Sequence, residues 1–117
     1  LFHGFATMLA RLAWTEGFGR IVSLSATFGL VEWLREFVLT GFPWNAVGLA
    51  AMPTPLLMQS AAVIGVTGMN SVAVLVFSAP ALLADHRMSR TGLTVAATLL
   101  IAHAGFGTWR SSQPYVP

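Results

Sequence analysis

The feature that most constrains this chain is the length of its apolar blocks, which are separated by short polar, glycine-rich or proline-rich breaks. Several blocks run for about 17 to 21 residues, the length that an α-helix needs to cross a hydrocarbon core of ~30 Å at 1.5 Å per residue. Only 9% of the 117 residues are charged, against roughly 25% in an average soluble domain. A soluble fold could not solvate its surface with so few charges, so the sequence predicts a membrane protein.

Four apolar segments predict an all-α fold, a polytopic bundle of transmembrane helices with about three full spans. The segments are Leu1–Ala13, Ile21 to about Thr40, about Gly68 to Ala84, and Leu93 to about Trp109. As a helix, the first segment reaches only about 20 Å, which is too short to span the membrane. The sequence also does not begin with Met. We therefore expect a fragment of a longer protein, with a partial first span.

Glycines and small residues mark an expected turn and an expected contact. Gly17 and Gly19 predict a turn after the first segment, because glycine disfavours a helix. The small residues Ser25 and Gly29 lie four positions apart and would share one face of a helix. This pair predicts close packing against another helix.

A short helix is expected at 55–64, before the next full span. Thr54 is its predicted cap, and Pro55 suits its first turn. The sequence GVTG at 65–68 predicts a break after it. Pro80 should kink the following span or mark its last turns.

The placement of arginine predicts the orientation in the membrane. Basic residues in the connections after the first and third segments are Arg11, Arg20, Arg87 and Arg90, whereas the connection at 41–55 has none. By the positive-inside rule, the arginine-bearing turns face the cytoplasm. Residues 41–55 and the C-terminal tail then lie outside, which is the periplasm for a bacterial inner membrane. Arg110 is the one basic residue on the opposite side.

The charges that most need an explanation lie in the stretch EWLREFVLTGFPW. At spacings of three and four residues, Glu32 faces both Arg35 and Glu36 on one helical turn. A charge that faced lipid there would cost on the order of 2.5 to 3.5 kcal/mol. Two interpretations stay open. The Glu32–Arg35 pair anchors the helix near the interface, or the excess carboxylate and the guanidinium line a polar cleft for an amine or a phosphate headgroup.

The loop TGFPWN follows this charged turn directly. Gly41 releases the helix, Pro43 biases Phe42 toward extended backbone, and the aromatic residues suit the depth of lipid headgroups. The loop is either a helix stop with an aromatic anchor, or part of a lipid-access wall that Phe42 and Trp44 help to form.

Other polar residues give weaker indications of function. His103 is either a proton carrier or a hydrogen-bonded residue at a helix interface, and His3 lies too near the start of the sequence to interpret. Asn70 and Ser71 are expected to hydrogen-bond between helices. The sequence has no cysteine, no Gly-rich phosphate loop, no metal-ligand cluster and no arrangement of Ser, His and Asp. We therefore expect no metal, no cofactor and, without a basic cluster, no nucleic-acid partner.

Two stretches, EWLREFVLTGFPWNAVG and PLLMQSAAVIGVTGMNSVAVLV, make this chain resemble the apolipoprotein N-acyltransferase family of the bacterial inner membrane. The resemblance rests on four different motifs that follow one another in the same order as in the family. They are the EWLR turn, the TGFPW helix exit, the short helix containing QSA and the IGVTG break. It covers essentially the whole chain. It implies that residues 1–110 are part of a transmembrane region, and that 111–117 lead to an extracytoplasmic nitrilase-like domain.

The resemblance implies a segment of an enzyme that transfers an acyl chain from a phospholipid to the N-terminal amine of a diacylglyceryl-cysteine apolipoprotein. In the family, a Cys thioester, a Glu base and a Lys within the nitrilase-like domain carry this reaction. This sequence has neither Cys nor Lys, so we expect no catalytic residue here and no activity from this part alone. The expected partners are the phospholipid donor, the apolipoprotein acceptor, the bilayer and the chain's own nitrilase-like domain.

The resemblance also implies a set of substrate-binding residues. The positions that match the family's motif are Glu32, Arg35, Gly41, Phe42, Pro43, Trp44 and Asn45. In the family, this region helps to form a cleft on the membrane side of the catalytic domain. Leu49 departs from the pattern, because an aromatic residue often follows the glycine equivalent to Gly48. The resemblance therefore implies no ring stacking at this position.

Two other interpretations remain. One is a small four-helix transporter or scaffold subunit, in which Glu32 and Glu36 form a proton or cation site. The other is a related membrane region fused to a glycosyltransferase. The sequence that follows Pro117 would distinguish them, because only an acyltransferase of this family continues into a nitrilase-like domain with Glu, Lys and Cys.

Overall fold

The computed structural model describes residues 1–38, 46–84 and 90–114 of the chain. In chain order its elements, where η marks a 3₁₀ helix, are α1 (Phe2–Leu12), α2 (Phe18–Arg35), η2 (Val47–Ala51), α3 (Pro55–Met58), α4 (Ala61–Ser78), η3 (Ala79–Ala84) and α5 (Arg90–Ser111). No strand occurs within these ranges. The predicted all-α fold is confirmed.

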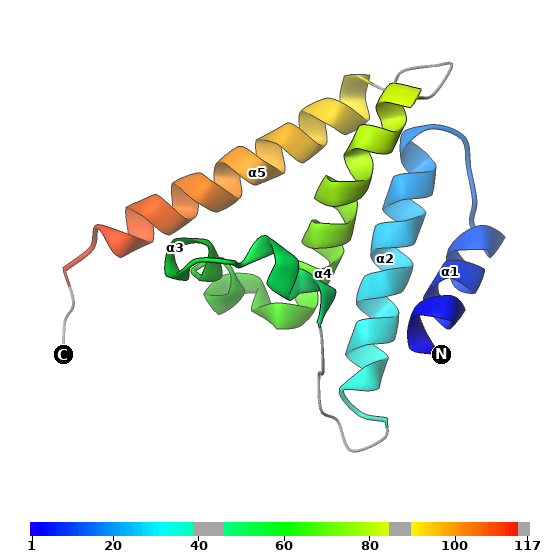
Figure 1. Cartoon of the computed structure of the whole chain (residues 1–117), viewed down its shortest axis with the longest axis horizontal. Helices are drawn as coiled ribbons and strands as arrows, with labels where there is room; N and C mark the ends of the chain where they lie inside the picture. The colour runs from blue at the N-terminus through cyan, green and yellow to red at the C-terminus, as the bar shows by residue number, and fades with distance from the viewer. Residues whose placement is uncertain (39–45, 85–89, 115–117) are drawn as a thin grey trace.

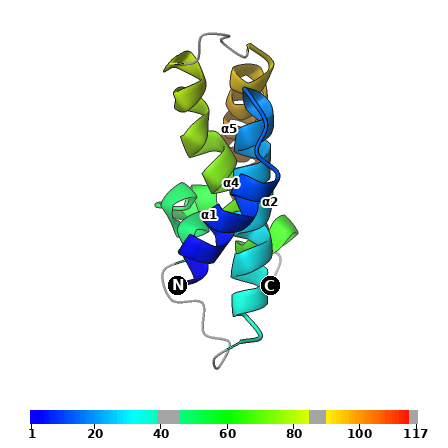
Figure 2. The same ribbon diagram turned by 90° about the vertical axis from the view of Figure 1, so that its right-hand side faces the viewer.

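The helices form a thin layer. In Figure 1, α1, α2, α4 and α5 lie across the molecule in this order, and neighbouring helices run in opposite directions. The Cα atoms extend over 50 × 39 Å in the plane of the layer and only 17 Å through it, as the edge-on view in Figure 2 shows. Most side chains therefore lie close to one of the two faces of the layer.

Two helical stretches of the described residues are long and apolar enough to cross a membrane. They are Ala61–Ala84 and Arg90–Ser111. Helix α2 has 18 residues, which reach about 27 Å, and it contains Arg20, Glu32 and Arg35. The third full span therefore stays a prediction.

Small residues bring α2 and α4 into close contact. The hydroxyl of Ser25 donates a 2.7 Å hydrogen bond to the backbone carbonyl of Ser71. One turn further along α2, a Cβ at Gly29 would collide with the side chain of Ser71. The packing face predicted from Ser25 and Gly29 is confirmed, and it sets the distance between these two helices.

The predicted break lies inside α4. Gly65 has φ +69° and ψ 172°, a backbone conformation that glycine adopts most readily, and it kinks the helix there. The predicted helix at 55–64 is consequently in two pieces, which are α3 and the residues of α4 before the kink. Thr54 caps α3 as expected, because its hydroxyl accepts a 3.4 Å hydrogen bond from the amide of Leu57. Pro80 lies in η3, where the α-helix has given way to a 3₁₀ helix.

The predicted boundaries of α2 are wrong at both ends. The helix begins at Phe18, before the expected Ile21, and it includes Gly19. At this position only glycine avoids a collision with the side chain of Thr15. It ends at Arg35 and not near Thr40. The amides of Glu36 and Phe37 bond to carbonyls three residues back, at 3.1 Å each. This tightening of the last turn is typical of a helix end.

Helix α5 packs against other elements near both of its ends and diverges from α4 between them (Figure 1). At one end, Gly92 of α5 leaves room for Leu82 of η3 and Phe18 of α2. At the other end, Gly107 of α5 packs against the backbone of Leu56 in α3. Figure 1 shows the resulting wedge, with α3 lying across its open end.

Candidate functional site

The charged turn predicted from the sequence lies at the end of α2, between α1 and α4. Glu32 is only 3% exposed. One carboxylate oxygen, Oε2, accepts from the guanidinium of Arg35 at 3.1 Å, and the other, Oε1, lies 3.1 Å from His3 Nε2 in α1. We call His3, Glu32 and Arg35 the charged cluster. The structure thus brings Glu32 and Arg35 together as predicted and adds a partner from another helix.

His3 is the member of the cluster that the sequence did not identify. Its ring stacks on Phe28 of α2, with ring centroids 5.6 Å apart and an interplanar angle of 9°. The side chain of His3 is half exposed, whereas that of Glu32 is not. His3 therefore lies between the buried carboxylate and the surface of the layer. No sequence pattern marked this contact, because the two residues lie 29 positions apart on different helices.

Glu36 bonds to a residue of α4. Its carboxylate accepts a hydrogen bond from the hydroxyl of Thr67, which lies in α4 just after the kink at Gly65. The expected contact of Glu32 with Arg35 is confirmed, and Glu36 bonds to Thr67. The two carboxylates bind different neighbours, Glu32 toward α1 and Glu36 toward α4.

The arrangement has a clear electrostatic consequence. A buried carboxylate without partners would be strongly unfavourable, and bonds to a guanidinium and an imidazole offset that cost. The side chain of Arg35 remains 14% exposed and Glu36 is half-buried. Arg35, Glu36 and His3 therefore each keep part of their surface exposed, whereas Glu32 is buried.

The chain returns to α4 shortly after the predicted loop. The amide of Gly48 in η2 donates a 2.6 Å hydrogen bond to Asn70 Oδ1, and a Cβ at Gly48 would lie 2.7 Å from the backbone nitrogen of Asn70. Asn70 therefore links two elements, as expected. The remaining predicted site residues, Gly41, Phe42, Pro43, Trp44 and Asn45, lie outside the described residues.

His103 is hydrogen-bonded at an interface, one of the two alternatives that the sequence left open. Its Nδ1 lies 2.7 Å from the hydroxyl of Ser60, and its Nε2 lies 2.9 Å from the carbonyl of Ala51. Since a carbonyl only accepts, Nε2 donates, and in the neutral ring Nδ1 accepts from Ser60. The ring ties α5 to the end of η2 and the start of α4. Within the described ranges, no group of three or more His, Cys, Asp or Glu could hold a metal ion.

A layer of antiparallel helices, two of them long and apolar enough to cross a membrane, is the architecture of an α-helical membrane protein. A family model described as the apolipoprotein N-acyltransferase N-terminal domain matches residues 1–79. The chain belongs to this family, as the resemblance of its motifs implied.

Curated relatives extend the match over nearly the whole chain. The identity is 58% over 113 residues with an apolipoprotein N-acyltransferase of Brucella suis biovar 1, 54% over 114 residues with one of Allorhizobium ampelinum, and 51% over 117 residues with one of Sinorhizobium medicae. These alignments cover 97% to 100% of this chain but only 21% to 22% of the relatives. The chain therefore spans about a fifth of the length of the curated relatives it matches. No solved structure matches it.

Proposed function

We propose that this chain is the membrane segment of an apolipoprotein N-acyltransferase, and that it contributes to the cleft in which lipid and apolipoprotein substrates are held. The full protein would transfer an acyl chain from a phospholipid to the N-terminal amine of a diacylglyceryl-cysteine lipoprotein. The names of the relatives support an acyltransferase that acts on apolipoproteins. This segment supplies walls and charges to the reaction, whereas the reacting groups belong to a nitrilase-like domain that follows 111–117.

The proposed substrate-binding residues are Glu32, Arg35 and the loop Gly41–Asn45. The observation that carries this assignment is the charged cluster itself, an ion pair with a buried carboxylate at the end of α2. Arg35 keeps part of its side chain accessible, and a guanidinium suits the planar oxygens of a phosphate headgroup. Glu32 contributes to the proposed site by holding Arg35 in position, because its Oε2 bonds to that guanidinium while its Oε1 lies against His3.

The proposed orientation places this end of the layer in the periplasm of a bacterial inner membrane. The antiparallel order of the helices supports it, because Arg20 and Arg90 lie at one end of the layer while the charged cluster lies at the other. By the positive-inside rule, Arg20 and Arg90 then mark the cytoplasmic side. The nitrilase-like domain would sit over the end of the layer that carries the cluster.

The transporter alternative required Glu32 and Glu36 to share one ion. Their hydrogen-bond partners lie on opposite sides of α2, since Glu32 binds Arg35 and His3 while Glu36 binds Thr67. This separation favours the acyltransferase interpretation, as does the family of the chain.

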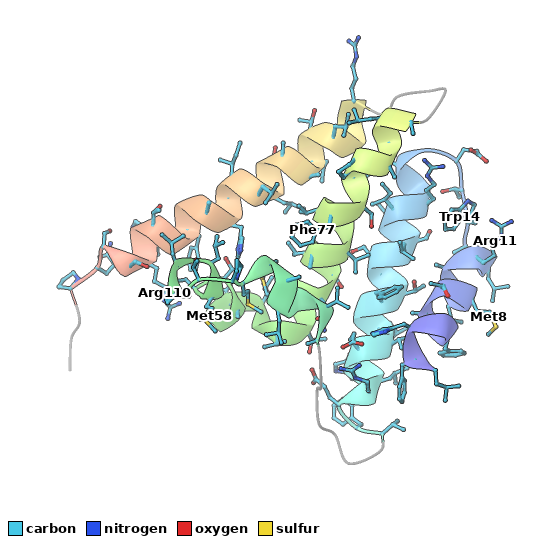
Figure 3. The ribbon with its side chains drawn as sticks, in the orientation of Figure 1. Met8, Arg11, Trp14, Met58, Phe77 and Arg110 are labelled. Carbon is cyan, nitrogen blue, oxygen red and sulfur yellow. The ribbon has the colours of Figure 1, made fainter. Side chains whose placement is uncertain are left out.

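The test is acyl transfer by the full-length protein in bilayers, with the variants Arg35→Ala and Trp44→Ala. Loss of the guanidinium in Arg35→Ala, a charged hydrogen-bond donor to substrate, should slow transfer by at least about tenfold, and loss of the indole in Trp44→Ala should slow it by opening the proposed lipid-access wall. Matched controls are Arg11→Ala, whose side chain lies on the outer side of α1 away from α2 (Figure 3), and Trp33→Ala, whose ring is 47% exposed in α2. Each protein is checked for insertion and thermal stability. Full activity in both Arg35→Ala and Trp44→Ala would refute the site.

A further inference from the structure

The ring of His3 touches α2 at two places, once with its face and once with its edge. The face stacks on Phe28, with ring centroids 5.6 Å apart and 9° between the ring planes. At the edge, Nε2 lies 3.1 Å from Oε1 of Glu32. Phe28 and Glu32 are four positions apart, so they lie on one side of α2. The stacking on Phe28 sets the plane of the imidazole, and this plane directs Nε2 at the carboxylate.

Small residues bring α1 close enough for this contact. Ala6 and Ala10 are fully buried, at 0% exposure, and α1 packs against α2. His3 lies three positions before Ala6 and seven before Ala10, on the same face of α1. Because these two positions carry only methyl groups, the two helices approach closely and the imidazole reaches the carboxylate directly.

The hydrogen bond runs from His3 to Glu32. A carboxylate that is paired with a guanidinium only accepts hydrogen bonds, and Oε2 of Glu32 lies 3.1 Å from the guanidinium of Arg35. Nε2 of His3 therefore carries the hydrogen and donates. The ring thus supplies a donor to the second oxygen of a carboxylate that is only 3% exposed.

Two partners on separate oxygens fix the orientation of the Glu32 carboxylate. The torsion that rotates a glutamate carboxylate has broad minima, so a single partner leaves the group free to turn. In this protein His3 binds one oxygen and Arg35 the other, each at 3.1 Å. The direction of Oε2, and with it the position of the guanidinium, therefore depends on His3.

Arg35 depends on this support because of its place in the chain. It is the last residue of α2, and helix ends fray. An ion pair between residues three positions apart stabilises a helix only weakly, and a long arginine side chain has many rotamers to lose. Recognition of a phosphate group uses the fixed fork of the guanidinium. A fork that turns away from its productive orientation loses part of that recognition.

We propose that His3 is a positioning residue of the substrate site. It acts through Glu32, whose other oxygen holds the guanidinium of Arg35 toward the phosphate group of the donor lipid. This role rests on the proposed function of Arg35 and extends that site to a second helix, α1. Loss of the donor should therefore weaken the binding of phospholipid and leave the chemical step unchanged.

The test compares two substitutions that each keep one of the two contacts of the imidazole. His3→Phe keeps a ring on Phe28 but has no donor, whereas His3→Gln keeps an N–H donor but has no ring. Acyl transfer by the full-length protein is measured in mixed micelles, in which detergent dilutes the phospholipid. We expect His3→Phe to raise the KM for phospholipid about fivefold with kcat unchanged. His3→Gln should recover most of that loss.

The control on the same helix is Met8→Ala. Met8 is 55% exposed and points away from α2, as Figure 3 shows. Its removal should leave both KM and kcat at their wild-type values. Insertion and thermal stability are measured for every variant, so that a loss of folded protein is not counted as a loss of affinity.

A second readout is the coupling between His3 and Arg35. Arg35→Lys keeps the positive charge beside Glu32 but lacks the fork, so it should raise KM by itself. In this background His3→Phe should have little further effect, because the group that His3 positions is gone. If His3 only stabilised the fold, the two effects on KM would instead multiply.

The outcomes separate this role from the proposed function. An unchanged KM in Arg35→Lys would refute the substrate site, and the role of His3 with it. A raised KM in Arg35→Lys together with a wild-type KM in His3→Phe would overturn the role of His3 alone, as would two effects that multiply. If His3→Phe does not fold, His3→Leu, which also lacks the donor, replaces it. Equal KM values in His3→Leu and His3→Gln would then overturn the role.

Discussion

The α2–α4 junction and the α4–α5 junction share one helix, yet the first closes and the second opens between its ends. In the closed junction, Gly29 of α2 meets Ser71 of α4 and Ser25 bonds to the same turn. Beside the open junction, the close contacts of α5 are with other elements, at Gly92 against η3 and α2 and at Gly107 against α3. Larger side chains, such as Leu99, stand between them and leave cavities. In a membrane, hydrophobicity does not drive apolar helices together. The spacing of small residues therefore decides at which positions two such helices can touch.

The largest expected effect is on the closed side of the molecule. Arg35→Ala removes the guanidinium from a carboxylate that is 3% exposed and should lower the free energy of unfolding by about 3 kcal/mol. Denaturation of the full-length protein in mixed micelles measures the loss. Glu36→Gln is the control, because its side chain is half-buried and an amide oxygen can still accept from Thr67. Wild-type stability in Arg35→Ala would mean that the cluster does not hold the end of α2.

The next effect sharpens the comparison within the open junction. Gly107→Ala would drive a methyl group into the backbone of Leu56, whereas Gly105, two residues earlier on α5, has nothing within 4 Å of where its Cβ would be. Gly107→Ala should destabilise the protein by about 2 kcal/mol through overpacking. Gly105→Ala should be neutral or stabilise it by up to about 1 kcal/mol, because alanine favours a helix. Equal melting temperatures for the two variants would show that α3 and α5 do not pack closely.

A smaller effect is expected where η2 meets α4. Asn70→Ala removes the acceptor for the buried amide of Gly48 and should cost about 1 kcal/mol. Ser71→Ala is the matched control, because Ser71 accepts from Ser25 through its backbone carbonyl and keeps that bond. Hydrogen exchange at Gly48, followed by mass spectrometry, should accelerate in Asn70→Ala alone. Unchanged exchange would exclude Asn70 as the anchor of η2.

The smallest expected effect comes from adding one methylene group on each side of α4, once at the α4–α5 junction and once in α2. Val72→Ile extends into the cleft between α4 and α5, which Val72, Leu99 and His103 line, and should stabilise the protein in detergent by at most about 0.8 kcal/mol. Val31→Ile enlarges a side chain that is 1% exposed in α2 and should destabilise by about 1 kcal/mol. Thermal melting in detergent distinguishes the two signs. A loss of stability in Val72→Ile would mean that the cleft is closed in solution.

Local features of the fold were predictable because local sequence determines them. The glycine at 65 set the kink, Thr54 and Pro55 set the start of α3, and Ser25 with Gly29 set a packing face. The ends of α2 were not predictable to within a turn, because Gly19 fits inside the helix beside Thr15 and the helix tightens after Arg35.

The candidate site was predictable only in part. The Glu32–Arg35 pair follows from a spacing of three residues on one helix. The bond from Glu32 to His3, and that from Thr67 to Glu36, join residues 29 and 31 positions apart. Such contacts depend on which helix lies beside which, and a single sequence does not specify that order. The cavities beside His103 arise for the same reason, from the angle between two helices.

The thinness of the layer has a consequence for the temperature and solvent response of this segment. In a slab of helices whose Cα atoms extend only 17 Å in the thin direction, almost every residue lies within one side-chain length of the surface. Its heat capacity of unfolding should therefore be small for its length, because the same apolar atoms face hydrocarbon before and after the helices separate. Changing the fluidity or thickness of the surrounding bilayer should alter its stability more than changing temperature over the physiological range.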